Sequence, residues 1–228
     1  MRRLLIALAL IGLAGDGRAA PPAAEREVAA LELGGKPPLE LSVVRQRLPD
    51  GGLKLRLLVS EKGGKKPASA VLYEGGGDDD GPGDKAFRGA TIEPYPLPGG
   101  KRGVRVDFEF QVPGSKKHRQ VDTYLASIDG APRLVLDATT RRERDRSKAC
   151  HEVEQATLAQ DKEGRLFVRP TSALESELND DDLPIDKGCK GKQAGRQVTY
   201  KFDGETFLQI DPPPAPAKKK AAEEADDD

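Results

Sequence analysis

The sequence predicts an all-β protein, an antiparallel meander that forms a sandwich or a barrel-like sheet. The main observation is a two-residue period: apolar and polar side chains alternate in LKLRLLV (53–59) and in RGVRVDFEFQV (102–112). Tight-turn signals separate such runs, among them Asp129-Gly130 and Asp203-Gly204, because the central residues of a type I′ hairpin turn need a positive φ. About ten or eleven short strands joined mostly by turns indicate this architecture.

The first twenty residues have the three-part pattern of a secretory signal peptide. Two arginines precede an apolar run from Leu4 to Ala14, and a small-residue segment ends at Ala19-Ala20, where we expect cleavage. The apolar run is too short to serve comfortably as a permanent membrane anchor. We therefore expect an exported protein, periplasmic or extracellular, with no membrane span after cleavage and with a flexible segment at residues 21–26.

A single β-rich domain is expected over residues 27–211. Its strand candidates, in chain order, are 28–33, 39–44, 53–59, 68–73, 104–112, 121–128, 133–138, 152–159, 165–169, 197–202 and 206–210. One short helix is predicted near residues 172–179, because Ser172 and Glu175 fit a capping box, in which each side chain bonds a free amide at the helix start. Residues 75–86 and 139–148 are expected to be long loops, and the second carries a solvated run of arginines.

Residues 212–228 are expected to remain a disordered tail. The segment begins with prolines and continues in blocks of like charge, KKK and then EEADDD, so it has little apolar surface to bury. Loss of residues 1–20 would remove three arginines and one aspartate and move the formal net charge from −1 to −3. This balance gives no basic footprint for a nucleic acid.

The stretch KACHEVE (148–154) places one of the two cysteines beside one of the two histidines. On a strand, Cys150 and His151 point to opposite faces, so they do not converge easily on one metal or substrate. Two cysteines in an exported chain favour a disulfide, and we predict the bond between Cys150 and Cys189. His118 is expected in a distant hairpin loop, which leaves a cysteine-histidine nucleophile pair as the alternative.

Two groups of carboxylates are candidate sites. Asp78, Asp80 and Asp84 lie in an acidic, glycine-rich loop and are candidates for calcium, although their spacing does not meet that of an EF-hand. Asp107 and Glu109 share one face of a strand about 7 Å apart, near the separation of the two acids of a glycosidase.

The motifs point away from several chemistries. The spacings of a phosphate loop, a serine elbow and a zinc-protease helix are all missing, so no catalytic residue and no cofactor is predicted. We expect a non-enzymatic binding or structural module of the cell envelope, whose partner is an envelope protein or a polysaccharide. Two alternatives stay open: a secreted hydrolase that uses Asp107 and Glu109, and a calcium-dependent binding module.

Overall fold

The computed structural model describes residues 24–64, 66–76, 81–112, 114–115, 117–181 and 183–210. Within these ranges the chain forms two antiparallel sheets and a single 3-10 turn, η1 (Pro98–Gly100), in a sandwich-like arrangement. The predicted all-β fold is confirmed. The predicted signal peptide (1–20) and the predicted tail (212–228) lie outside the described residues.

The first sheet contains four strands in chain order, β1 (Arg26–Leu33), β2 (Leu39–Arg47), β3 (Leu53–Glu61) and β4 (Ala68–Gly75). The turn between β2 and β3 follows from its sequence: Gly51 adopts a φ of +89°, and the Gly52 amide donates to Asp50 Oδ1 over 2.8 Å. This turn sets the register in which Arg45 lies opposite Leu55.

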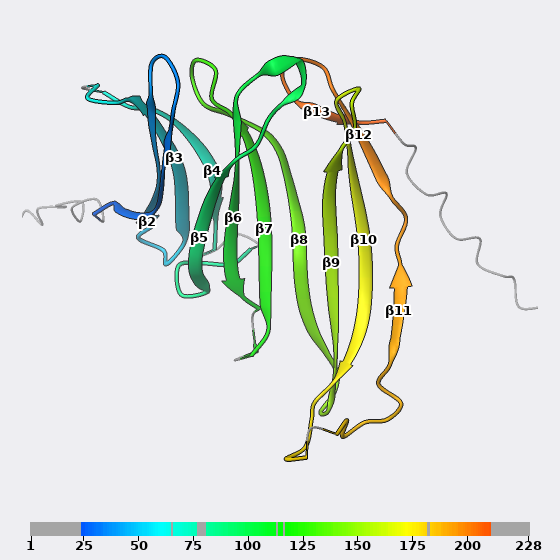
Figure 1. The fold of residues 1–228 in the computed structure, drawn as a ribbon. Helices are drawn as coiled ribbons and strands as arrows, with labels where there is room; N and C mark the ends of the chain where they lie inside the picture. Colours follow the sequence, from blue (N-terminus) through cyan, green and yellow to red (C-terminus); the bar gives the residue numbers. More distant parts are fainter. Residues whose placement is uncertain are drawn as a thin grey trace, which may run out of the picture.

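The second sheet contains nine strands. Eight follow the order β13-β12-β10-β9-β8-β7-β6-β5, and the ninth, β11, pairs with residues 171–174 of β10, beyond the part of β10 that pairs with β12. Its bounds are β5 (Phe87–Pro94), β6 (Gly103–Gln111), β7 (Arg119–Ser127), β8 (Arg133–Ser147), β9 (Cys150–Gln160), β10 (Arg165–Ser176), β11 (Gly191–Ala194), β12 (Val198–Phe202) and β13 (Phe207–Gln209). Strands β8–β10 extend past the ends of β5–β7, and β11 lies beside β10 at the edge of the sheet (Figure 1).

The main core lies between the four-stranded sheet and strands β5–β7 of the large sheet. The alternating apolar residues of β3 and β6 face each other there and are fully buried: Leu53, Leu55, Leu57, Val104, Val106, Phe108 and Phe110. A smaller core, built around Leu125, Leu166 and Phe207, lies beside the β12–β13 hairpin. The alternation read from the sequence therefore marks the sheet faces that bury apolar surface.

The inner face of the large sheet changes from apolar to polar beyond β6. Residues directly opposite each other on paired strands share a face, and one such row begins at Phe110 in the core. It continues across the sheet as Gln120, Arg142, Glu154, Ser172 and Gln193. The four-stranded sheet thus packs on the apolar half of this face, and the polar half over β8–β11 contains the exposed residue Arg142.

The predicted helix near residues 172–179 is wrong. Residues 172–176 instead continue β10, where Ser172 pairs with Glu154 on one side and with Gln193 on the other. A capping box is a local signal worth at most a few hydrogen bonds, and pairing with β9 and β11 satisfies the same backbone groups along the whole segment.

The predicted loop at residues 139–148 is also wrong, because β8 extends to Ser147. The arginines of this segment alternate with acidic residues, so no apolar period marks the strand. Charge pairs across β8 and β9 stabilise it instead, for example Arg144 with Glu152 over 2.8 Å.

Candidate functional site

An open groove of about 350 Å³ lies on the polar half of the inner face. The side chains of its central row come one from each of four strands: Arg142, Glu154, Ser172 and Gln193. Thr139, Ala156, Pro170 and Gly195 also line the groove. A guanidinium group, a hydroxyl and an amide can donate hydrogen bonds here, and the apolar lining is limited to small side chains. The groove therefore suits a hydrophilic ligand with acceptor oxygens.

Salt bridges beside the groove neutralise its carboxylates. Arg144 pairs with Glu152 and with Glu154, each over 2.8 Å, and Arg146 pairs with Glu152 over 2.5 Å. These four side chains balance in charge. Within the described part of the chain, Arg142 has no ion-pair partner, so it leaves the groove with an excess positive charge.

Glu152 makes this salt-bridge network sensitive to acid. The hydrogen bond from Arg144 is the main reason that the pKa of Glu152 lies below its ordinary value, and the charges of Arg144 and Arg146 add to it. A lowered folded-state pKa stabilises the protein above the unfolded pKa of about 4.3, and this stabilisation is lost as the pH falls through the folded pKa.

We therefore expect Glu152→Gln to lower the urea midpoint of unfolding at pH 7, by an amount that shrinks by pH 3. Glu205→Gln, at an exposed residue whose ion pair with Arg133 spans 3.4 Å, serves as the control and should change the midpoint little at either pH. An equal loss for Glu152→Gln at both pH values would show that its charge is not the cause.

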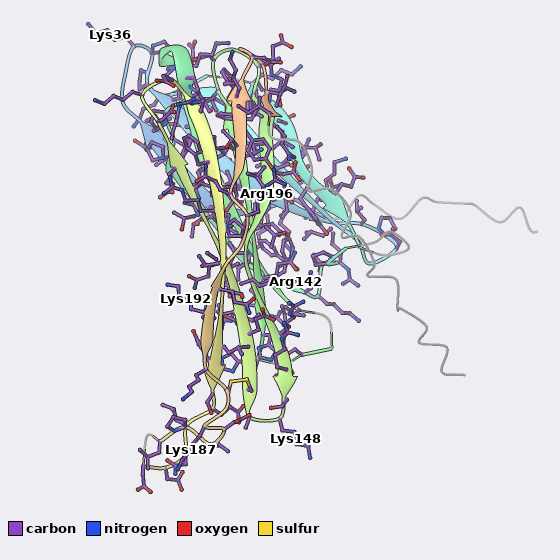
Figure 2. The ribbon with its side chains drawn as sticks, turned by 90° about the vertical axis from the view of Figure 1, so that its right-hand side faces the viewer. Lys36, Arg142, Lys148, Lys187, Lys192 and Arg196 are labelled. Atoms are coloured by element: carbon purple, nitrogen blue, oxygen red, sulfur yellow. A yellow bond between two sulfur atoms is a disulfide. The ribbon has the colours of Figure 1, made fainter. Side chains whose placement is uncertain are left out.

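A row of exposed cations borders the groove; we call Lys187, Lys190, Lys192 and Arg196 the cationic edge. The stretch from Lys187 to Phe202 contains five basic residues and no acidic one. Within the described residues none of the four forms an ion pair. Figure 2 shows Lys192 and Arg142 on opposite sides of the sheet, with Lys187 and Lys148 further down; the register agrees, because Gln193 shares the row of Arg142 and the adjacent Lys192 lies opposite Ala173. Arg142 therefore adds positive charge to the groove, and the cationic edge adds positive charge along the neighbouring edge of the sheet, where Lys192 points to the opposite face.

The predicted disulfide agrees with the structure. The sulfur atoms of Cys150 and Cys189 lie 2.00 Å apart, and both residues are buried. Cys150 begins β9 and Cys189 stands two residues before β11, so the bond ties the cationic edge to the β8–β9 hairpin. Because both sulfur atoms form this bond, neither cysteine is free to act as the nucleophile of a cysteine-histidine pair. A disulfide is compatible with an oxidising, exported location.

The rings of His118 and His151 lie close together, a contact that the sequence did not predict. His118 and His151 have ring centroids 5.8 Å apart, and carboxylates flank both rings. His118 Nε2 lies 2.6 Å from Asp145 Oδ1, and His151 Nε2 lies 3.5 Å from Glu175 Oε2. Among the described residues, no group of three or more histidine, cysteine or acidic side chains could hold a metal ion. The cluster therefore forms a set of polar contacts on the face opposite the groove.

The other candidate acids are engaged elsewhere. Asp107 pairs with Arg105 over 2.9 Å on the outer face, and Glu109 pairs with Arg119. A shallow hollow of about 280 Å³ touches both acids. Asp84 is buried and accepts a hydrogen bond of 2.8 Å from Nε of Arg45. Asp78 and Asp80 lie outside the described residues.

The groove residues themselves were not singled out by the sequence. Arg142, Ser172 and Gln193 come together only through the register of four strands. The acid-free stretch from Lys187 to Phe202 is a sequence signal that could have indicated this edge.

The fold and the groove define a sandwich-like β-protein with a charged surface site. Comparison with known families, curated proteins and solved structures finds no match to this chain. Within the described residues, no helix is long and apolar enough to cross a membrane.

Proposed function

We propose that this protein is an exported, non-enzymatic binding module for an acidic polysaccharide. The observation that carries the proposal is the groove around Arg142. Neither Arg142 nor the cationic edge beside the groove has an ion-pair partner in the described structure. Unpaired surface cations attract a polyanion over about 10 Å at moderate salt.

The groove supplies the contacts that a charged sugar needs. The guanidinium of Arg142 can bind a carboxylate through two parallel hydrogen bonds. Ser172 and Gln193 lie on the same row and can bond hydroxyl groups of the sugar ring. This combination favours a uronic-acid polymer over an apolar ligand.

Two other roles, protection of a sheet edge and hydrolysis, explain fewer of these residues than polysaccharide binding does. Lysine on an edge strand prevents pairing with foreign strands, which explains Lys192 but neither Arg142 on β8 nor Arg196 after the end of β11. A hydrolase would need free carboxylates at the groove, and the acid in its described lining, Glu154, pairs with Arg144.

The test is calorimetric titration of the full chain with polygalacturonate, a polymer that carries one carboxylate per sugar. Arg142→Gln should weaken binding about tenfold, because a hydrogen bond to a charged group contributes about 1.5–3 kcal/mol and 1.4 kcal/mol corresponds to a factor of ten. Changing Lys190, Lys192 and Arg196 together to glutamine should weaken binding at least as much and flatten its salt dependence.

Lys36→Gln is the matched control, because Lys36 is exposed, has no ion pair in the described structure and lies at the opposite end of the molecule in Figure 2. It should bind as the unchanged chain does. Equal affinity for uncharged dextran would contradict the proposal, and affinity for poly-L-glutamate equal to that for polygalacturonate would assign the surface to acidic proteins instead.

A further inference from the structure

The sequence beyond the last described residue, Ile210, ends in a cluster of acids. Five of its last six residues are Glu223, Glu224, Asp226, Asp227 and Asp228. We propose that this acidic segment, 223–228, docks on the cationic edge of the same chain. The regulatory consequence, competition with the polysaccharide, rests on the function proposed above; the docking itself does not.

Chain geometry allows this contact. The amide of Ile210 donates to the carbonyl of Thr199 over 3.0 Å, so residue 210 lies beside β12. Thr199 is seven residues from Lys192, a span of at most about 25 Å. The thirteen residues from Ile210 to Glu223 reach up to about 43 Å when extended, and about 40 Å as a polyproline II helix. The acidic segment can therefore reach the cationic edge with length to spare.

The cationic edge differs from the outer face of the large sheet in how its charges are paired. Arginines and acids of the outer face already pair with each other, as Arg105 does with Asp107 and Arg141 with Glu143. The cationic edge instead presents four cations without ion-pair partners within the described structure. The five carboxylates of the acidic segment are enough to pair with all four.

Tethering makes a weak contact effective. Each exposed ion pair contributes little by itself, but a segment joined by a short linker has an effective concentration in the millimolar range. The contact is also screened by salt. The acidic segment should therefore occupy the edge at low ionic strength and give way to a long polyanion, which makes more contacts.

Zero-length carbodiimide cross-linking of the full chain, mapped by mass spectrometry, tests the docking directly. We expect cross-links from residues 223–228 to Lys187, Lys190 or Lys192 at low salt and their loss at 1 M salt. Cross-links only to Lys218–Lys220 would show that the tail neutralises itself, and cross-links that favour Lys36 would show unspecific contact. Either result would overturn the proposal.

A full-length variant separates docking from function. In it, glutamine replaces Glu223 and Glu224, and asparagine replaces Asp226, Asp227 and Asp228. Its affinity for polygalacturonate should rise about tenfold at low salt, because an occupied site lowers the apparent affinity by the free fraction. Equal binding by both chains would contradict the competition. Edge cross-links without polygalacturonate binding by either chain would contradict the proposed function and leave the docking supported.

Discussion

Replacing Cys150 and Cys189 with serine is expected to lower the free energy of unfolding by about 4 kcal/mol. The bond closes a loop with a sequence separation of 39, and the chain-entropy relation assigns about this value to a loop of that size. The loss should be uneven: β11 has four exposed residues and pairs with β10 alone, so it should detach before the two cores unfold. Binding to polygalacturonate should fall with it.

Urea unfolding with and without a reductant measures this effect. The unchanged chain should become less stable when reduced, and the double serine variant should not respond to the reductant. Hydrogen exchange should show lost protection at residues 191–194 and retained protection in β6. Identical midpoints for the oxidised chain and the variant would mean that the bond contributes no stability.

Phe108→Ala is expected to cost about 3–5 kcal/mol, the range for removing a fully buried aromatic ring. Phe108 has no exposed surface, and its ring lies 5.0 Å from that of Tyr124 and 6.4 Å from that of Phe87, measured between centroids. Phe108 belongs to the same buried cluster as the leucines of β3, so its removal would leave a cavity within close-packed side chains.

Phe167→Ala is the matched control for this measurement. Phe167 lies partly exposed on β10, beneath Arg165 and Arg169. The same change of side chain should therefore cost clearly less there. A loss at Phe108 no larger than that at Phe167 would show that the two sheets do not depend on this part of the core.

The sequence predicted the elements whose one face is buried. In β3 and β6 the buried side chains of the alternating run are leucine, valine or phenylalanine. The two-residue period therefore indicates both the strand conformation and the face that is buried. The Cys150–Cys189 pair followed from the number of cysteines and the expected compartment. These inferences need no knowledge of which strands become neighbours.

The end of β8 and the end of β10 could not be predicted in this way. At the end of β8, charge pairs such as Arg144 with Glu154 replace apolar burial. The end of β10, residues 172–176, has no two-residue apolar period. The groove depends on register as well: an irregularity between Val121 and Asp122 decides which residues of β8 reach the inner face. Strand order and this bulge, which unite Arg142 with Ser172 and His118 with His151, are tertiary properties that local spacing does not encode.

Hydrogen exchange with and without polygalacturonate, followed by mass spectrometry on the full chain, tests the proposed binding surface most directly. We predict slower exchange on ligand addition at residues 139–142, 170–174 and 190–196, and unchanged exchange in β1–β4. Protection confined to the outer face around Asp107 and Glu109, or no protection at a polymer concentration that saturates binding, would contradict the assignment of the groove and the cationic edge as the binding site.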